Sequence, residues 1–459
     1  IVCGRCSRCP VSCPTSLPRR HPFQASRMSQ YVGVLIVNCG EIAHMSSGDT
    51  SQPLVGAQMM ERWENTFPAG NGIVISESSI ERIDDSESLQ SEFAPWWDGS
   101  NSISGDMMVF DAEGKAVTPG FVDCHTHLLW GGDRSSEMRL RQAGMTYRQI
   151  AEAGGGIAKT VMSTRGMSTP ELCRTGISRL HQAASTGTTV LEAKSGYGLD
   201  TKSELRLLEA MDIINNSNPV KLLPTWLGAH DFPPGRTRSE YLEELVNSQL
   251  PAVAEQGIAR WADVFCENGW YSNDETEMIV RAAADHGLPA RLHVDEFEDS
   301  GGLALAAELG AVSGDHAAKS SLDSRHAAAE SGTMQTFLPG TPYVLGNPLD
   351  SPLSKCIEEN WAFSLATDYN PNCRILSMPF IGNLATSRMG LDPFAALVAA
   401  TRNPSTTLDD PDVTGMIAER GRADINILWS QSVDGWCQTP GENPVIATII
   451  AGSIVNVNE

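Results

Sequence analysis

Eight short apolar segments recur through the middle of this 459-residue chain. Stretches between them, such as 201–214 and 274–287, place apolar residues at helical spacing. Eight strands that alternate with helices predict an α/β fold, a (β/α)8 TIM barrel. The eight segments are GFVDCHTH, TTVLEAKSGYG, VKLLPTWLGAH, ADVFCENG, ARLHVDEF, AVSGDH, TMQTFLPG and AFSLATDYN.

Polar residues end nearly every one of these segments. A doubly wound open sheet is the alternative fold, but it gathers ligands at a single switch point. A barrel instead brings all eight strand ends to one catalytic face. The chain has 10 His in total, and five of them occupy such ends. The polar residues at strand ends are His125, His127, Lys194, Tyr197, His230, Glu267, His293, Glu296, His316, Asp368 and Asn370.

Short strand patterns also occur on both sides of the predicted barrel. Segments such as YVGVLIVNCG and GIVISESSIERIDD precede it, and ADINILW and VIATIIAGSIVNV follow it. We expect the two ends of the chain to form one flanking β-sandwich. Residues 28–116 and 416–459 would supply its two parts, and residues 117–415 would form the barrel.

The first forty residues differ from the rest, because they contain no Asp or Glu. Their cysteines, followed by Pro14, match the spacing of half a bacterial ferredoxin motif, but no partner run exists elsewhere to hold a second cluster. An organelle transit peptide is another interpretation. We favour a disordered leader or non-native extension over residues 1–27, with the natural start at Met28. The cysteines of this run are Cys3, Cys6, Cys9 and Cys13.

The formal net charge of -23 argues against a nucleic-acid-binding protein, because such proteins carry basic stripes. An acidic membrane surface would repel the chain, and no apolar run approaches the roughly 20 residues of a transmembrane helix. The 11 Cys are odd in number, and those after residue 38 follow no regular frame. This pattern favours reduced thiols in a cytoplasmic enzyme over a disulfide scaffold.

His125 and His127 form an HxH pair at the end of the first barrel strand. Alternation along a strand points both imidazoles to the same side, as a metal site requires. Alone, such a pair is equally consistent with two half-buried structural histidines. The later strand ends, with His293, His316 and Asp368, favour the metal site.

Several blocks of the sequence together resemble the imidazolonepropionases of the amidohydrolase superfamily, over roughly residues 119–403. The resemblance implies a TIM barrel with a flanking β-sandwich and one divalent metal ion, zinc or iron. The metal ligands that it implies are His125, His127, His293 and Asp368. The blocks are TPGFVDCHTHLLWGGDR, AGGGI, EAKSGYGLD, LGAH, LHVDEF, GDH and ATDYNPN.

Three neutral imidazoles and one carboxylate suit such an ion independently of the resemblance, since they leave it a net positive charge and room for water. A water held there can ionise near pH 7, with a pKa of about 7 in favourable sites. A binuclear centre bridged by a carboxylated Lys194 is the alternative. We interpret Lys194 as structural or as a support for the ligands.

The resemblance also implies that Arg134, Tyr197 and His230 bind the substrate. Arg134 can pair with a carboxylate through two hydrogen bonds, although a salt bridge to Asp133 or Glu137 is the alternative role. Tyr197 offers a hydroxyl and a flat face to a ring, and His230 can bond a polar ring edge.

Three further residues are predicted to act in catalysis. Glu296 is the carboxylate that we expect to contact the substrate and to carry a proton from water to the leaving nitrogen. His316 could polarise the carbonyl oxygen as charge develops on it, with a core histidine as the alternative. Asp368 would both bind metal and receive a proton.

Asn370, Asn372 and Cys373 are predicted to hold the product. Bacterial imidazolonepropionases often carry Asn-Pro-Gly followed by Ser or Thr here, whereas this chain has Asn370-Pro371-Asn372-Cys373. A thiol is a weaker hydrogen-bonding group than a hydroxyl, so the contact from Cys373 would differ from that of the bacterial members.

The resemblance implies hydrolysis of the ring C–N bond of 4-imidazolone-5-propanoate to N-formimidoyl-L-glutamate, a step of histidine degradation. A cytosine- or guanine-type deaminase would use the same ligands on a different ring. A catalytically silent barrel that only binds a ligand, and an electron-transfer protein that uses the N-terminal cysteines, are more distant alternatives. The partner is a small-molecule substrate, and the family often forms homodimers.

Overall fold

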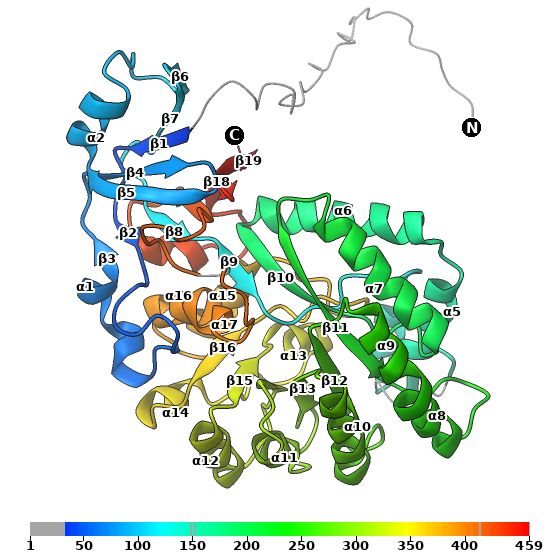
Figure 1. Cartoon of the computed structure of the whole chain (residues 1–459). Helices are drawn as coiled ribbons and strands as arrows, with labels where there is room; N and C mark the ends of the chain where they lie inside the picture. Colours follow the sequence, from blue (N-terminus) through cyan, green and yellow to red (C-terminus); the bar gives the residue numbers. More distant parts are fainter. Residues whose placement is uncertain (1–32, 147–148, 151–152, 413–414, 459) are drawn as a thin grey trace, which may run out of the picture.

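The computed structural model of the chain describes residues 33–146, 149–150, 153–412 and 415–458. Its centre is a barrel of eight parallel strands, in which neighbours along the chain are neighbours in the sheet (Figure 1). A bridge between Thr126 and Tyr369 joins the first strand to the last. The predicted barrel is therefore confirmed. Its strands are β9 (Phe121–Asp123), β10 (Thr188–Lys194), β11 (Lys221–Ala229), β12 (Trp261–Cys266), β13 (Ala290–Val294), β14 (Ser313–His316), β15 (Met334–Phe337) and β16 (Phe363–Leu365).

Helices surround the barrel and cover the outer faces of its strands (Figure 1). Local sequence sets where several of them begin: Asp200 accepts a hydrogen bond from the backbone N of Ser203 at the start of α7, and Ser272 caps α10. The helices of the barrel region are α3 (Glu137–Gln142), α5 (Gly156–Arg165), α6 (Thr169–Ser185), α7 (Thr201–Asn215), α8 (Arg238–Glu244), the π-helix η3 (Leu245–Gln249), α9 (Leu250–Gln256), α10 (Asn273–Asp285), α11 (Gly302–Glu308), α12 (Leu322–Ser331), α13 (Gly340–Leu345), α14 (Leu353–Glu358), α15 (Met378–Ser387), α16 (Pro393–Ala400) and α17 (Arg402–Ser405).

Two more sheets flank the barrel. One has the order β5-β4-β1-β7-β6, and the other has the order β19-β18-β17-β8-β2-β3. The second sheet combines strands from both ends of the chain, since β17 pairs antiparallel with β8. The flanking strands are β1 (Gly33–Val37), β2 (Ile42–Ala43), β3 (Thr66–Phe67), β4 (Asn71–Ser76), β5 (Ser79–Asp85), β6 (Ser102–Ser104), β7 (Met107–Asp111), β8 (Val117–Pro119), β17 (Ile425–Leu428), β18 (Val445–Ile450) and β19 (Ser453–Val457).

Alternating Ile and Val side chains join these two sheets into one hydrophobic cluster. Ile36 and Ile75 belong to the five-stranded sheet, whereas Val117, Ile427 and Ile449 belong to the six-stranded sheet. This packing explains why both chain ends carry strand patterns of the same kind. Short elements complete the region: η2 (Gly56–Met60), α1 (Arg62–Asn65), α2 (Ser86–Phe93) and η4 (Val433–Cys437). We propose domain limits at residues 28–116, 117–415 and 416–459.

The predicted leader, with its four cysteines, lies outside the described residues. Within the described part of the chain, all seven cysteines are free thiols and buried. No helix among the described residues is long and apolar enough to cross a membrane.

Candidate metal centre and active site

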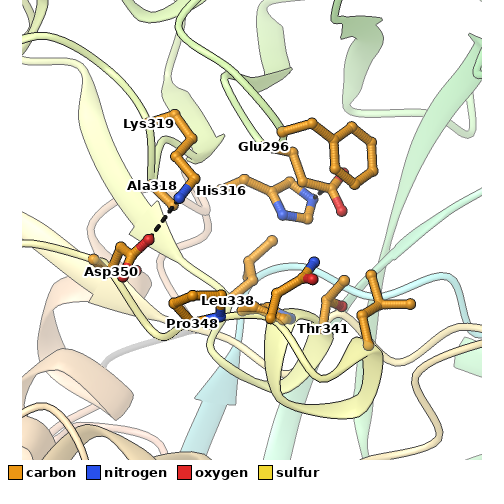
Figure 2. Close-up of a pocket in the computed structure, with 13 residues that line it drawn as sticks. Glu296, His316, Ala318, Lys319, Leu338, Thr341, Pro348 and Asp350 are labelled. Atoms are coloured by element: carbon orange, nitrogen blue, oxygen red, sulfur yellow. Dashed lines mark hydrogen bonds and ion pairs between the residues drawn. The ribbon is translucent and has the colours of Figure 1, made fainter. Parts of the chain in front are cut away.

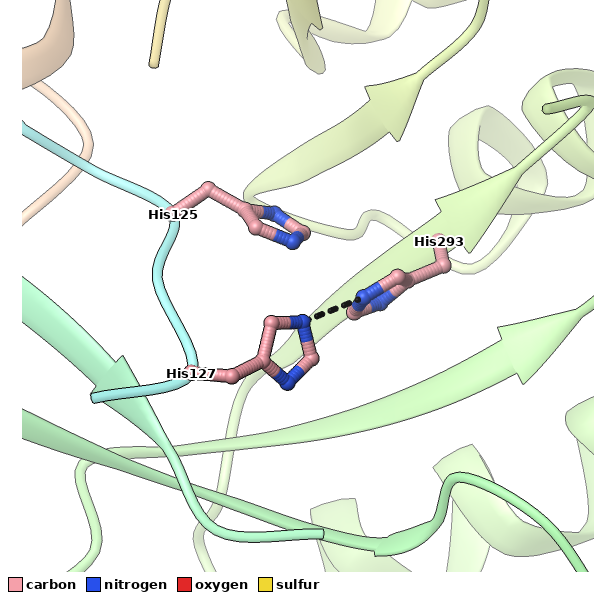
Figure 3. Close-up of side chains that lie close together, drawn as sticks. All are labelled: His125, His127 and His293. Atoms are coloured by element: carbon pink, nitrogen blue, oxygen red, sulfur yellow. Dashed lines mark hydrogen bonds between the residues drawn. The ribbon is translucent and has the colours of Figure 1, made fainter. Parts of the chain in front are cut away.

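Three imidazoles converge at the carboxyl ends of the barrel strands. His125 and His127 follow β9, and His293 lies on β13; Figure 3 shows the three rings turned toward one another. All three side chains are buried. Nε2 of His127 lies 3.3 Å from Nε2 of His293. Asp368, which follows β16, brings its Oδ1 to 3.5 Å from Nε2 of His127 and 3.7 Å from Nε2 of His125.

These separations suit a single bound ion. Ligand atoms about 2.0–2.1 Å from a tetrahedral ion lie about 3.3 Å from one another. Nε2 of His125 has no hydrogen-bond partner among the described residues, although it is buried. A buried polar atom without a partner is costly, and a metal ion would satisfy it. The donor set therefore fits a divalent metal.

Two buried aspartates fix the tautomers of two of these histidines. Nδ1 of His125 lies 2.6 Å from Oδ2 of Asp315, and Nδ1 of His293 lies 3.0 Å from Oδ1 of Asp263. An ionised carboxylate only accepts hydrogen bonds, so each Nδ1 carries the proton and each Nε2 presents its lone pair. Burial lowers the pKa of His293 to about 3, and the positive charge of Lys194 adds to this effect. The neutral imidazole is the form that binds a metal.

Lys194 lies beneath the two aspartates. Its Nζ is 2.8 Å from Oδ2 of Asp263, 3.1 Å from Oε1 of Glu192 and 3.6 Å from Oδ2 of Asp315, and all four side chains are fully buried. Burial alone would lower the pKa of Lys194, but the three carboxylates raise it above its usual range. The ammonium group therefore offsets part of the negative charge of the acids that orient the metal-binding histidines. This arrangement supports a structural role for Lys194 over a carboxylated bridge.

Asp368 is held in place by a residue of α13. Its Oδ2 accepts a hydrogen bond from Oγ1 of Thr341, while its Oδ1 faces the imidazoles. Its backbone has a φ of +50°, in the left-handed region that few non-glycine residues adopt. Such a conformation persists where surrounding contacts fix it, and it often marks a functional site. Burial raises the pKa of Asp368 to about 7 in the metal-free protein.

Glu296 and His316 face each other beside the imidazoles. Nε2 of His316 lies 3.7 Å from Oε2 of Glu296. Glu267, at the end of β12, accepts hydrogen bonds from the backbone N of Glu296 at 2.7 Å and of Phe297 at 3.2 Å, which fixes this turn. Burial raises the pKa of Glu296 well above its usual range, and the charges of Asp368 and Glu267 raise it further. Such a carboxyl can hold a proton near neutral pH.

Two adjoining cavities meet at this pair. One, of about 50 Å³, is lined by His127, His293 and Asp368 of the metal site and by Arg134, Tyr197 and His230. The other, of about 260 Å³, is lined by Glu296, His316 and Thr341 and by an ion pair between Lys319 and Asp350 (Figure 2). Its lining also includes the apolar residues Leu338, Pro342, Leu345 and Pro348.

His230 and Tyr197 form one wall of the smaller cavity. The His230 ring stacks on that of His127, with centroids 4.9 Å apart and planes 19° apart. Its Nδ1 donates to the carbonyl oxygen of Gly196 at 2.9 Å, so Nε2 is the acceptor. The Tyr197 ring lies 5.2 Å from that of His230. This wall offers a ring face and an acceptor nitrogen.

Arg134 reaches the same cavity but is paired with a neighbour. Its Nε and Nη2 donate to Oε2 of Glu137 at 3.0 and 2.7 Å. The salt bridge to Glu137, which the sequence offered as an alternative role for Arg134, is therefore present in the structure. Arg134 also lines the cavity, so the two roles are compatible.

The predicted product-binding residues have different positions. Asn370 and Asn372 line the cavity. Oδ1 of Asn370 accepts hydrogen bonds from the backbone N of Asn372 at 2.8 Å and of Cys373 at 2.9 Å, so this side chain shapes the loop. Oδ1 of Asn372 accepts a hydrogen bond from Nη1 of Arg141. Among the described residues, those that line the cavity do not include Cys373, because its thiol turns inward toward the carbonyl oxygen of Thr367, at 3.8 Å.

The sequence interpretation missed Asp263, Asp315 and Thr341, and it did not anticipate the contact of Glu137 with Gly156. Asp263 stands within the otherwise apolar strand β12, and that contrast was a usable signal, since an unpaired buried charge is costly. Asp315 gave a weaker signal, because β14 also contains Ser313 and His316. Thr341 gave no comparable signal, because its contact with Asp368 depends on where α13 packs.

Comparisons with known proteins agree with this geometry. A family model described as amidohydrolase family matches residues 108–345. A 5-methylcytosine deaminase from Klebsiella pneumoniae has a similar structure, with a TM-score of 0.67 and 14% sequence identity over 93% of this chain and 98% of that one. A zinc-bound adenosine deaminase from Xanthomonas campestris gives a TM-score of 0.64 and 14% identity, over 93% of each chain. The barrel and its site thus define an enzyme of the amidohydrolase class.

Relatives of known function identify the family within this class. An imidazolonepropionase from Symbiobacterium thermophilum is 41% identical over 403 residues, which cover 86% of this chain and 89% of the relative. An imidazolonepropionase from Haloarcula marismortui is 38% identical over 75% of this chain and 82% of the relative. The chain belongs to the imidazolonepropionase family, as its sequence blocks predicted.

Proposed function

We propose that this protein hydrolyses the ring C–N bond of 4-imidazolone-5-propanoate and releases N-formimidoyl-L-glutamate, a step of histidine degradation. The observation that carries the proposal is the convergence of three imidazoles and Asp368 at a cavity that Glu296 and Arg134 also line; His127 and His293 are the two imidazoles that reach its surface. The imidazoles and Asp368 suit a metal that hydrolyses a cyclic amide, and the positive charge of Arg134 suits the propionate of the substrate. The family relationship supports the same substrate.

His125, His127, His293 and Asp368 would hold one divalent ion, zinc or iron. When bound, such an ion lowers the pKa of a water molecule and polarises a carbonyl group. His316 also lies close to His125 and Asp368. We assign His316 to the carbonyl oxygen of the substrate instead, because its Nε2 faces Glu296 and the larger cavity.

Glu296 would carry the proton between water and the leaving ring nitrogen. Its carboxyl lies 3.7 Å from His316, and its raised pKa suits a group that takes and gives a proton near neutral pH. Asp368 would receive a proton from the attacking water through the same carboxylate that faces the imidazoles. Breaking the C–N bond then leaves the ring carbonyl carbon as a carboxylate and the nitrogen as the formimidoyl NH.

The substrate would be oriented by three side chains of the smaller cavity. Arg134 would bind the propionate through two hydrogen bonds. Nε2 of His230 would accept a hydrogen bond from a ring N–H, and Tyr197 would cover the ring. Asn370 and Asn372 would shape the end of the cavity that holds the product. Cys373 would act through packing beneath this loop, because its thiol turns away from the cavity.

A deaminase of the cytosine or guanine type is the second candidate. Deaminases share this fold at 14% identity, a likeness that concerns the fold alone. Arg134 favours the imidazolone, because the propionate has a carboxylate and a nucleobase has none. Incubation of metal-loaded protein with each substrate class, with identification of the products, tests the choice. Ring opening of the imidazolone supports the proposal, whereas ammonia release from a nucleobase without ring opening would overturn it.

A cytoplasmic location and a homodimeric state belong to the same proposal. Cell fractionation and size-exclusion chromatography with light scattering test them separately from the activity.

A further inference from the structure

Glu137 joins the block that ends at Arg134 to the AGGGI block, through a contact that spans 19 residues of the sequence. Its Oε2 accepts both hydrogen bonds from Nε and Nη2 of Arg134, and its Oε1 accepts one from the backbone N of Gly156 at 3.0 Å. The side chains of Arg134 and Glu137 are only 4% and 3% exposed. A buried carboxylate with three donors of this kind holds all its partners in fixed positions.

The Gly156 contact lies at the amino end of α5, where backbone N–H groups and the helix dipole favour a negative charge. The next residue, Ile157, lines the same cavity as Arg134. Glu137 therefore ties one cavity wall to another through its two oxygens. The charge of the carboxylate suits both partners, the guanidinium and the helix terminus.

The glycines of the AGGGI block make this approach possible. A Cβ on Gly155 would lie 3.1 Å from Oε1 of Glu137 and 2.9 Å from the carbonyl oxygen of Ile150. Gly156 has a φ of +66°, which favours glycine. The glycines of this block thus allow the backbone to approach Glu137 closely. None of the predicted catalytic residues requires this approach.

We propose that Glu137 is a positioning residue for substrate selection: it fixes the guanidinium of Arg134 so that the enzyme prefers ligands with a propionate carboxylate. Glu137 bonds the Nε and Nη2 groups of the guanidinium. Glu137 does not touch the reacting atoms. The inference rests on the proposed function for the identity of the carboxylate ligand.

The test uses two probes with the same ring, imidazole-4-propanoate and 4-ethylimidazole, and measures their dissociation constants by calorimetry with metal-loaded protein. Any contribution of the ring, including its contact with the metal, cancels in the ratio of the two constants. Glu137→Gln keeps the size of the side chain and removes its charge. We expect the preference for the propanoate probe to fall about tenfold, the size of one weakened charge-assisted pair.

Glu275 offers a matched control away from the cavity. It accepts hydrogen bonds from Nε and Nη2 of Arg238 and from the backbone N of Ser272, the residue that caps α10. Glu275→Gln removes an equivalent charge from an equivalent set of donors. We expect it to leave the preference for the propanoate probe unchanged.

Glu137→Asp provides a second variant if the Gln protein folds poorly, since it keeps the charge but shortens the reach, and the same fall in preference is expected. Equal weakening of both probes, or an unchanged ratio, would overturn the inference. Because the assay measures binding, it separates this outcome from a failure of the proposed function, which would leave the ring of 4-imidazolone-5-propanoate intact in the wild-type protein.

Discussion

Nδ1 of His125 lies 2.6 Å from Oδ2 of Asp315, and neither side chain is exposed to solvent. This contact fixes which nitrogen of His125 carries the proton and directs Nε2 toward His127, His293 and Asp368. Asp263 does the same for His293. The geometry of the candidate metal centre thus depends on residues that never touch the ion.

Asp315→Asn should weaken metal binding by about 10- to 100-fold, the usual effect of losing a carboxylate behind a ligating histidine. Competition against a fluorescent chelator measures the affinity. Asp424→Asn is a control, because Asp424 is also buried but bonds Arg422 near the six-stranded sheet. Equal affinities for wild type and Asp315→Asn would show that this contact does not orient the ligand.

Lys194→Met should destabilise the metal-free protein by about 3–5 kcal/mol, because it leaves three buried carboxylates without their cation. Urea unfolding after metal removal measures this free energy. Lys355→Met, which breaks an ion pair on the surface of α14, should cost much less. A similar loss in both variants would contradict the role assigned to Lys194.

His293→Ala and Glu296→Gln should separate metal binding from proton transfer. We expect His293→Ala to lose the metal and the activity together. Glu296→Gln should retain the metal but lose about 10²- to 10⁴-fold in kcat, the usual contribution of a positioned acid or base. Metal analysis and steady-state kinetics on the same preparations measure both. Full activity in Glu296→Gln would exclude it as the proton carrier.

Acid should destabilise the metal-free protein through its buried histidines. Burial lowers the pKa of His230 to about 3 from an ordinary value of 6.5. Between these values the unfolded chain binds a proton that the folded protein does not, so stability falls as the pH falls from 6.5 toward 3. His230→Gln should reduce this slope by up to about 1.4 kcal/mol per pH unit. Urea unfolding of both proteins at pH 7 and pH 5 measures how the free energy of unfolding changes with pH. An equal change in wild type and His230→Gln would contradict the prediction.

Cys373→Ser should leave kcat/KM nearly unchanged, because the thiol faces the carbonyl oxygen of Thr367 and not the cavity. Asn370→Ala should lower activity, since it removes two hydrogen bonds that shape the loop beside Asp368. Kinetic constants of both variants test this contrast. A large loss in Cys373→Ser together with normal activity in Asn370→Ala would reverse our assignment of the loop.

The barrel was predictable because each strand can be recognised from its own local sequence. Buried strands such as β11 and β12 are mostly apolar in sequence, and polar residues gather where the strands end. The convergence of His125, His127, His293 and Asp368 followed from the same rule, since strand ends in a barrel share one face.

Side-chain partners were harder to predict, because they depend on packing between segments far apart in the chain. The thiol of Cys373 could have faced the cavity or the core, and only the turn made by Asn370 decides between them. Likewise, Glu137 was recognised as a possible partner of Arg134, but its contact with Gly156 depends on how α3 and α5 meet.

Hydrolysis of 4-imidazolone-5-propanoate in water enriched with ¹⁸O tests the central claim most directly. If the groups around His125, Asp368 and Glu296 add water to the ring carbonyl, mass spectrometry should find N-formimidoyl-L-glutamate with one ¹⁸O in its newly formed carboxylate. Recovery of the intact ring, or release of ammonia without ¹⁸O in that carboxylate, would contradict the account.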